Sequence, residues 1–465
     1  MKRLYQHKAF ASIALLISAL FIMQTFTSCD SSKGVKYMAV QLEKGDDWSI
    51  IDEDGNVVVK EEYDKDDIVS MVYENDVFWV KSNKKYNLYS IDSPKKSLNK
   101  EEYDAVTDFY DNRAFAVVEG EPIQLIDSDG KLIKELPKSI IKTYGFSDGL
   151  APYMNKKGEH GYLDTNGEIA IDAKFYNTGG FADGFAVVQK KEDGNYLIIN
   201  KTGETVSTIN ANKYEVKINA FIEGKLCCID KKTDKTVFLN TNGEVVLTTR
   251  DKYVSAAFYE GYCTTLTDDG YKVGVIDENG EKIIRTGKYD GIANVGKGQF
   301  LVYKERERRG QDAKTMMLVD KDGEEIAEFD YKDPDYDYVF DDHASKVEIY
   351  TLGDNIIARE GKYMILIDRE GKPIEGEGAE FHNKSCHVFP YGIFYNDMED
   401  TGDTYEDEDD YLYEDSVAWD VDSVCSYDYS DDYGDDYDYG DDYDYGDDYD
   451  VYEYADSAVE YYDIE

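Results

Sequence analysis

Residues 162–167 read Tyr-Leu-Asp-Thr-Asn-Gly, and this pattern of two apolar or aromatic residues, an Asp or Asn, two further residues and a Gly recurs along the chain. From Gly130 to Gly280 the Gly returns at steps of 37, 36, 40 and 37 residues. A fixed period of this length indicates an array of similar structural units. The Gly residues expected to turn the chain are Gly55, Gly130, Gly167, Gly203, Gly243, Gly280, Gly323 and Gly371, and a degenerate copy occupies residues 90–95.

Each of these Gly residues is expected to close a turn between two β-strands. Asp-Gly and Asn-Gly between apolar runs are strong hairpin signals, because Gly adopts a positive φ without steric cost. Alternating segments follow the turns, such as Asn-Val-Val-Val at residues 56–59 and Glu-Val-Val-Leu at residues 244–247. Three or four short strands per repeat predict an all-β fold.

Two further landmarks recur with the same period. One is Phe-x-Asp/Glu-Gly, at residues 146–149, 181–184, 221–224 and 258–261. The other is an aromatic residue after a charged turn, with copies at Tyr63, Tyr103, Tyr176, Tyr214, Tyr253 and Tyr289.

Together with His-Gly-Tyr-Leu-Asp at residues 160–164, these landmarks resemble the WG-repeat family, in which Phe-x-Asp-Gly-x-Ala precedes Trp-Gly-Tyr-Ile-Asp and a Gly turn. The resemblance covers about nine repeats over residues 36–395. Residues 273–277 keep the Gly without the Trp, and residues 48–52 keep the Trp without the Gly. The resemblance implies a β-repeat architecture with a binding or scaffold role and no known chemistry.

The repeats are expected to form one domain over residues 36–396, because a single repeat cannot bury its apolar face alone and must stack on its neighbours. A four-stranded repeat suits the blade of a propeller, but nine repeats exceed the usual four to eight blades. Tandem β-repeats of about 37 residues therefore predict either a propeller-like ring or a superhelical β array with degenerate ends.

The N-terminal residues 1–28 are expected to be a signal peptide. Three cations within residues 2–8 precede an apolar run at residues 9–23, which is shorter than the roughly 20 residues of a membrane-spanning helix. Residues 26–29, Phe-Thr-Ser-Cys, resemble the lipobox of bacterial lipoproteins.

The lipobox resemblance implies that Cys29 is lipidated and becomes the first residue of the mature protein. Residues 29–35 would then link the lipid to the repeats. The expected location is the bacterial cell envelope, at the periplasmic face or the cell surface, with the membrane bound through the lipid.

Several short motifs point to chemistry that the repeats explain in another way. Residues 145–149 match the Gly-x-Ser-x-Gly nucleophile elbow, but the next repeat has Ala in place of the Ser and no helical pattern follows. Asp-x-Asp-Gly at residues 52–55, 127–130 and 320–323 resembles half of a calcium loop, yet the first ligand position is apolar. Turn formation is the favoured interpretation of both motifs.

The Cys and His residues are expected to be structural. His382 and His387 flank Cys386, but no second cluster with zinc-ligand spacing accompanies them. Cys227 and Cys228 are adjacent in a predicted strand, so their side chains should face opposite ways, with one of them in the core. A loop is expected at the basic residues 306–309.

Residues 397–465 form a separate acidic and tyrosine-rich segment. They hold 30 of the 99 acidic residues and 15 of the 42 Tyr, without a Lys or Arg. Self-repulsion and the scarcity of aliphatic residues predict a disordered, low-complexity tail. Its carboxylates could bind divalent cations weakly, and the candidates are Asp435, Asp436, Asp441 and Asp442.

The expected function is binding or scaffolding by a lipid-anchored envelope protein, with a protein or glycan partner. A net charge of −48 argues against nucleic acid as that partner, because affinity for phosphates rests on Lys and Arg. Neither catalysis nor a cofactor is expected. The alternatives are an envelope enzyme, such as a glycan hydrolase with two paired carboxylates, and a purely structural spacer.

Overall fold

The structure is a computed structural model that describes residues 35–70, 76–253, 255–267, 272–308, 311–331, 350–385 and 392–394. All of them belong to the compact unit Met1–Ser426, whereas the second unit, Tyr427–Glu465, lies outside the described residues. The predicted signal peptide, Cys29, Cys386, His387, the acidic tail and its Asp435, Asp436, Asp441 and Asp442 also lie outside them.

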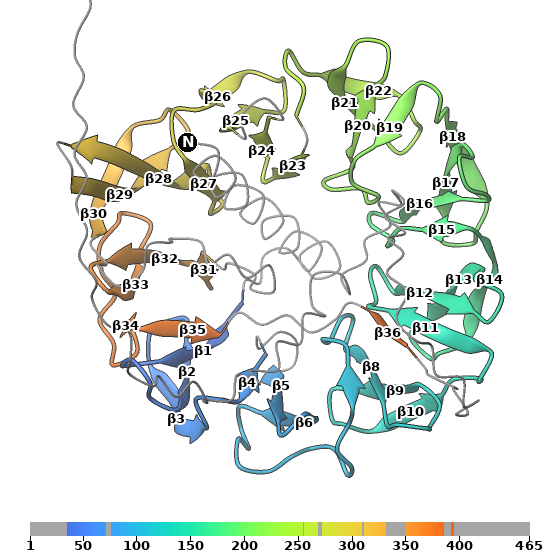
Figure 1. Cartoon of the computed structure of the whole chain (residues 1–465), viewed down its shortest axis with the longest axis horizontal. Coiled ribbons are helices and arrows are strands. Elements are labelled where there is room, and N and C mark those ends of the chain that lie inside the picture. The colour runs from blue at the N-terminus through green and yellow to red at the C-terminus, as the bar shows by residue number, and fades with distance from the viewer. Residues whose placement is uncertain are drawn as a thin grey trace, which may run out of the picture. The chain divides into compact units, whose positions relative to one another are not determined.

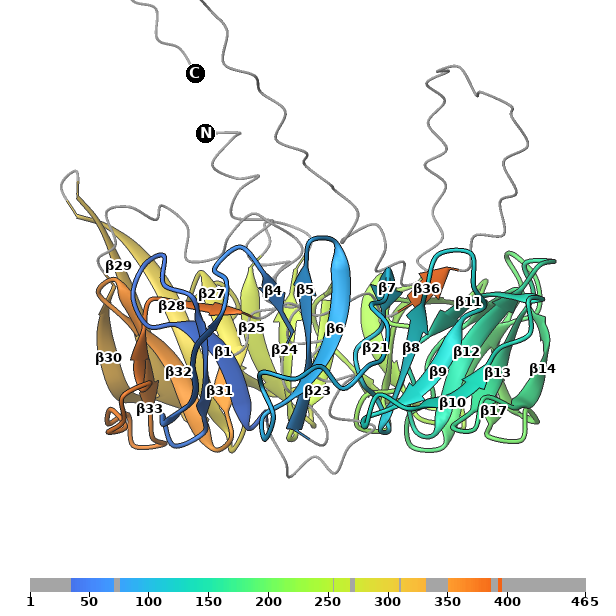
Figure 2. The same cartoon turned by 90° about the horizontal axis from the view of Figure 1, so that it is seen from below.

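The described residues form an all-β, nine-bladed propeller, which confirms the predicted fold class. Nine small antiparallel sheets are arranged around a common axis, as Figure 1 shows in face view and Figure 2 in side view. No α-helix occurs in the described ranges, so none of their segments is a helix long and apolar enough to cross a bilayer.

The first five blades follow the chain in order. Blade 1 contains β1 (Tyr37–Gln41), β2 (Trp48–Asp52), β3 (Val57–Tyr63) and, from the far end of the domain, β35 (Asn383–Ser385). Blade 2 contains β4 (Ile68–Val69), β5 (Val77–Ser82) and β6 (Lys85–Ser90), and blade 3 contains β7 (Ala105–Val106), β8 (Arg113–Val117), β9 (Gln124–Asp127) and β10 (Leu132–Glu135). Blade 4 contains β11 (Ile140–Tyr144), β12 (Leu150–Asn155), β13 (His160–Asp164), β14 (Ile169–Phe175) and the late strand β36 (Gly392–Phe394), and blade 5 contains β15 (Asn177–Thr178), β16 (Phe185–Gln189), β17 (Tyr196–Asn200) and β18 (Thr205–Ile209).

The last four blades complete the ring. Blade 6 contains β19 (Tyr214–Val216), β20 (Leu226–Asp230), β21 (Lys235–Leu239) and β22 (Val245–Thr248), and blade 7 contains β23 (Ser255–Tyr259), β24 (Tyr262–Leu266), β25 (Val273–Asp277) and β26 (Lys282–Ile284). Blade 8 contains β27 (Gly291–Asn294), β28 (Gln299–Arg308), β29 (Gln311–Asp320) and β30 (Glu325–Tyr331), and blade 9 contains β31 (Thr351–Leu352), β32 (Asn355–Glu360), β33 (Tyr363–Ile367) and β34 (Glu380–Phe381).

A four-stranded blade runs from an inner strand, A, to an outer strand, D; in blade 5 these are β15, β16, β17 and β18. Blade 2 has strands A to C, and in blade 4 the added strand β36 pairs with strand A, β11. Because successive strands are antiparallel, the AB and CD turns lie on one face of the ring and the BC and DA loops on the other. These are called the AB/CD face and the BC/DA face below.

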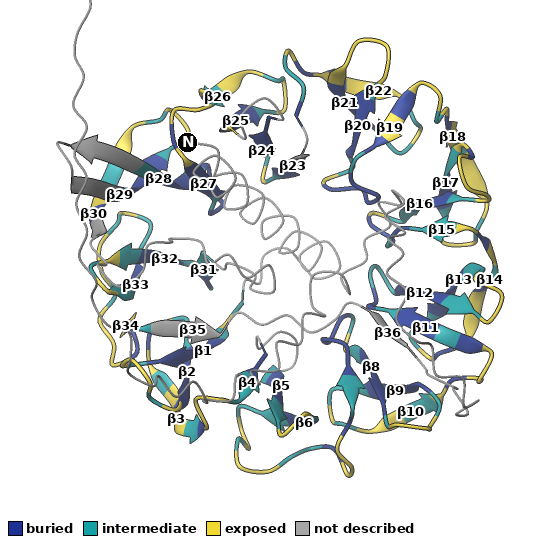
Figure 3. Ribbon diagram, in the orientation of Figure 1, coloured by how far each residue is buried: buried dark blue, intermediate teal, exposed yellow. Residues whose placement is uncertain are grey.

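The hydrophobic core is divided among the interfaces between neighbouring blades. Nine clusters of buried apolar residues are found in the described ranges, one for each pair of adjacent blades. A blade is therefore covered on both sides, and Figure 3 shows its central strands largely buried and its outermost strand more exposed. Covering on both sides explains why strand C reads as a continuous apolar run instead of an alternating one.

The ring is closed, which decides between the two architectures that the repeats allow. Strand β35 pairs with β1, with Ala39 opposite Ser385 and Gln41 opposite Asn383. One of the nine clusters joins blade 9 to blade 1 and includes Met38, Leu352 and Phe381. Blade 1 thus takes its innermost strand from the C-terminal end of the domain.

Two local expectations are wrong. Cys227 and Cys228 are both buried, 3% and 0% exposed, because β20 is covered by blade 7 on one side and by blade 5 on the other. Burial raises the pKa of the Cys227 thiol to about 12. Residues 306–308, expected in a loop, extend strand β28, which forms a long hairpin with β29.

Candidate binding faces of the propeller

The CD turns of the AB/CD face are built by the repeated Asp or Asn. In blade 4 the Gly167 amide donates to the Asp164 carbonyl at 2.9 Å, and the Asp164 Oδ1 accepts the amides of Asn166 and Glu168 at 2.9 Å each. Only the Gly has a positive φ, +73°, so this is a turn with a bulge at the Gly rather than a two-residue hairpin. The eight repeat Gly residues all have φ between +72° and +79°.

The same side-chain capping recurs in all eight of these turns. One side-chain oxygen accepts the amides two and four residues later, over 2.8–3.1 Å, and the capping residues are Asp52, Asp127, Asp164, Asn200, Asn240, Asp277, Asp320 and Asp368. The calcium-loop-like stretches are therefore capped turns. Among the described residues, no group of three or more His, Cys, Asp and Glu side chains is placed to hold a metal ion.

The AB turns are the two-residue hairpins of this fold, and they are formed by Phe-x-Asp/Glu-Gly. In blade 4, Asp148 and Gly149 both have positive φ, +56° and +83°. Ser147 and Leu150 exchange both backbone hydrogen bonds across the turn. The Phe before each turn is buried against the preceding blade; the Phe146 ring stacks on Phe115 with 5.2 Å between centroids.

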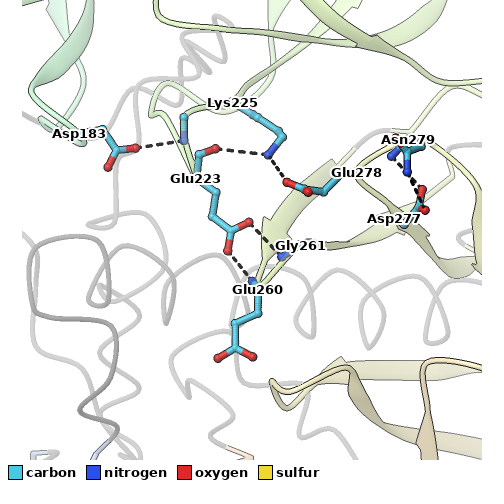
Figure 4. Close-up of polar contacts among 9 residues, drawn as sticks. Asp183, Glu223, Lys225, Glu260, Gly261, Asp277, Glu278 and Asn279 are labelled. Carbon is cyan, nitrogen blue, oxygen red and sulfur yellow. Dashed lines mark hydrogen bonds and ion pairs between the residues drawn. The ribbon is translucent and has the colours of Figure 1, made fainter.

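Carboxylates on the AB turns link each blade to the next. Asp148 Oδ2 accepts the Gly184 amide of blade 5 at 2.7 Å, and Asp183 Oδ2 accepts the Gly224 amide of blade 6 at 3.0 Å. Glu223 accepts the amides of Glu260 and Gly261 in blade 7, as Figure 4 shows. The series begins with Asp111, which accepts the Gly149 amide, and ends with Glu260, which accepts the Lys297 amide.

These carboxylates are expected to stabilise the ring. In the variant Asp183→Gly, the Gly tolerates the φ of +53°, but the acceptor for the Gly224 amide is lost. The free energy of unfolding should therefore fall by about 1 kcal/mol. Asp193→Gly is the matched control, because Asp193 has φ +52° and forms no hydrogen bond to another blade in the described structure. Urea unfolding of both variants measures the difference. Equal midpoints would contradict a stabilising role for the carboxylate.

The elbow-like stretch lies in one of these AB turns. Residues 145–149 connect strand β11 to strand β12, and the Ser147 hydroxyl donates to the Phe181 carbonyl of blade 5. The context is thus strand, turn and strand, whereas a nucleophile elbow joins a strand to a helix. Of the His and Cys residues at 382–387, only His382 lies among the described residues. It follows β34, and its ring centroid is 6.2 Å from that of Tyr363.

The BC/DA face carries a periodic set of lysines, which sequence reasoning missed. BC turns of blades 4, 5 and 6 each hold a Lys-Lys pair, and a Lys precedes the aromatic residue at four successive DA corners. We call this set the lysine face: Lys156, Lys157, Lys190, Lys191, Lys231, Lys232, Lys174, Lys213, Lys252 and Lys288.

Most side chains of the lysine face are exposed, and six of them form no ion pair within the described residues. Lys252 pairs with Asp234 at 3.1 Å, and Lys213 and Lys288 lie over the rings of Tyr214 and Tyr289. Six others form no ion pair in the described structure, namely Lys157, Lys174, Lys190, Lys191, Lys231 and Lys232. The same turns and corners also carry acids, namely Glu159, Glu192, Asp193, Asp230, Asp234, Asp251 and Asp290, and Asp230 interacts with Lys213.

The two faces of blades 4–7 therefore differ in charge. The AB/CD face presents the turn carboxylates, and two lysines there are paired, Lys201 with Asp148 at 2.5 Å and Lys225 with Glu278 at 3.1 Å. In the described loops of the BC/DA face, lysines outnumber acids. A positive sector on a body this acidic can attract an anionic ligand and orient its approach.

Comparison with known families agrees with the repeat. The family model described as WG containing repeat matches residues 48–86 and 161–196, which confirms the resemblance at these two stretches. Each match begins in or just before strand C of one blade and ends in the next blade. The sequence repeat is therefore offset from the structural blade. A comparison with the curated proteins finds no match.

Several solved structures are similar to this one. A crystal structure of the eukaryotic initiation factor shares 10% identity, with a TM-score of 0.46, over 77% of this chain and 99% of that one. Hsv2 of Kluyveromyces lactis shares 12% identity, with a TM-score of 0.34, over 53% and 94% of the two chains. A Bacteroides caccae protein of unknown function shares 12% identity, with a TM-score of 0.22, over 64% and 94%.

Proposed function

We propose that this protein is a lipid-anchored binding or scaffold module of the bacterial cell envelope, and that its lysine face binds an anionic protein or glycan partner. The observation that carries the proposal is the set of six exposed lysines without an ion pair, repeated on neighbouring blades of a closed ring. A rigid propeller keeps such charges in place before binding, which lowers the entropic cost of association. No catalytic step is part of the proposal.

The described chain begins on the opposite side of the ring from the lysine face. The Val35 carbonyl accepts the amide of Gly353, which belongs to the AB turn of blade 9, so the described chain begins at the AB/CD face. Cys29 precedes Val35 by six residues, a span of at most about 20 Å. A lipid at Cys29 would therefore hold the AB/CD face toward the membrane and leave the lysine face directed away from it.

Lipidation of Cys29 has a direct test. Cys29→Ser should abolish incorporation of a labelled fatty acid and leave the protein soluble or unprocessed, because the thiol is the expected site of acylation. Metabolic labelling of cells that produce either form is the measurement. Equal labelling of the variant would exclude Cys29 as the anchor.

Binding through the lysine face is tested by affinity capture from native envelope at low and high salt. The variant K157Q/K190Q/K231Q removes three charges from the lysine face, and the control K131Q/K321Q/K372Q removes three exposed charges from the CD turns of the other face. We expect recovery of the partner to fall in the first variant alone and to weaken with salt. Protease and glycosidase treatment of the captured material separates a protein from a glycan.

Capture should be run on the full chain and on a chain that ends at Asn396. Equal, salt-independent recovery by both variants would contradict a role for the lysine face. Turnover of an envelope glycan by the purified protein would instead favour the hydrolase alternative. A structural spacer would capture nothing in any of these arms.

A further inference from the structure

The last described strand, β36, runs toward the face of the ring that carries the lysine face. Strand β36 pairs antiparallel with β11, with Gly392 opposite Tyr144 and Phe394 opposite Lys142. Strand β11 begins at Ile140, after the DA loop, and ends before the AB turn. Since β36 runs the opposite way, Phe394 lies at the end of β36 nearer the BC/DA face of blade 4.

The loops at this edge of blade 4 begin the lysine face. The Lys156 amide in the BC turn of blade 4 donates to the Ser139 carbonyl in the preceding DA loop at 3.0 Å, which brings Lys138 and the Lys156–Lys157 pair to one corner. The BC turns of blades 5 and 6, with Lys190, Lys191, Lys231 and Lys232, follow around the ring.

The segment that follows β36 has the opposite charge. Residues 397–426 contain 13 Asp and Glu and no Lys or Arg. Thirty residues span at most about 100 Å when extended, which is enough chain to pass over several blades. A segment tethered beside its site has an effective concentration of about a millimolar, so weak single ion pairs can add up to binding.

The geometry points to an intramolecular contact in which residues 397–426 bind the lysine face of blades 4–6. The inference rests on the proposed binding role of that face, because the acidic segment would then compete with an external anionic partner. A partner must displace the segment, so binding is limited to ligands with a denser or better placed negative charge. Salt weakens both contacts, since exposed ion pairs are screened.

Carbodiimide coupling of the full chain tests the contact, because the reagent joins a Lys amine to a carboxylate only when the two touch. We expect amide cross-links between residues 397–426 and Lys157, Lys190, Lys191, Lys231 or Lys232. Exposed lysines of the AB/CD face, Lys131, Lys321 and Lys372, serve as controls and should not couple to the segment. Mixing unlabelled and ¹⁵N-labelled protein shows whether a cross-link forms within one chain.

A second measurement uses acetylation rates. Neutralising the 13 acids of residues 397–426 with Asn and Gln should raise the reactivity of the lysine face about fivefold at low salt, with no change at the control lysines and no difference near 1 M salt. Cross-links to both faces alike, mixed-isotope cross-links alone, or unchanged acetylation would overturn the inference. Intramolecular cross-links without any captured partner would support it while contradicting the proposed function.

Discussion

Replacing Gly161 by Ala is expected to destabilise the propeller by about 3 kcal/mol, because the added methyl group has no room. A Cβ at Gly161 would lie 2.4 Å from the Ile171 carbonyl oxygen and 2.8 Å from the Ala173 amide nitrogen. Both are backbone atoms of strand β14, which cannot move aside without breaking its pairing with β13.

The close approach comes from a bulge in the outer strand. His160 pairs with Phe175 and Tyr162 with Ile171, so three residues of β14 face the single Gly161. The Ala173 amide, displaced by the bulge, donates to the Tyr153 hydroxyl at 3.1 Å.

Blade 1 has Ser49 at the equivalent place, and its hydroxyl forms a hydrogen bond with the bulged segment of β3. Trp48 pairs with Tyr63 and Ile50 with Val59, and the Ser49 hydroxyl accepts the Glu61 amide at 2.9 Å. In these two blades, whose outer strand bulges at this point, the place is occupied by Gly or by a small side chain that forms a hydrogen bond with the bulge.

Gly158→Ala is the control for Gly161→Ala. Gly158 has φ +76° and no atom within 4 Å of an added Cβ, so this change carries only backbone strain of about 1 kcal/mol. Urea unfolding of both variants is the measurement. If the free energy of unfolding falls with urea concentration at the same slope in both, the difference between their midpoints gives the steric contribution at Gly161. A Gly161→Ala variant no less stable than Gly158→Ala would show that the bulge relaxes around a side chain.

Removing the closing strand is expected to have the second large effect. A chain that ends at His382 lacks β35 and also β36, the added strand of blade 4. Loss of β35 leaves the backbone of β1 unpaired from Ala39 to Gln41 and opens the ring beside the cluster of Met38, Val40 and Phe381. We expect the loss of a large part of the roughly 5–15 kcal/mol that stabilises a folded domain.

The matched control is a chain that ends at Asn396, which keeps both β35 and β36 and removes only the acidic tail. Thermal unfolding followed by circular dichroism should show a lower and broader transition for the shorter chain only. If both truncated chains melt alike, closure through β35 contributes little, and the interfaces between neighbouring blades alone hold the ring together.

The repeat and its turns could be predicted because they depend on local interactions. Asp164 caps its own turn and Gly167 supplies the positive φ within a few residues of chain. Such features need no distant partner, so they appear in the amino-acid pattern itself. The all-β class followed from them.

Side-chain environments were harder to predict, because they depend on how the blades pack. Tyr176 belongs to the predicted series of aromatic landmarks, but it is 43% exposed and Phe175 beside it is 2% exposed. Neighbouring residues of a strand point to opposite sides, so a shift of one position exchanges them. The lysine face was missed because its members, in BC turns and at DA corners, are far apart in the sequence.

The sequence by itself determined the period, the strands, the turn residues and the composition of the acidic segment, since each is a property of residues near one another in the chain. The tertiary structure decided that the nine repeats close, that β35 completes blade 1 and that the two faces of blades 4–7 differ in charge. The physical reason is that closure depends on the small rotation between neighbouring blades summed around the ring. No single repeat encodes that sum, and only the assembled ring brings residue 383 to residue 41.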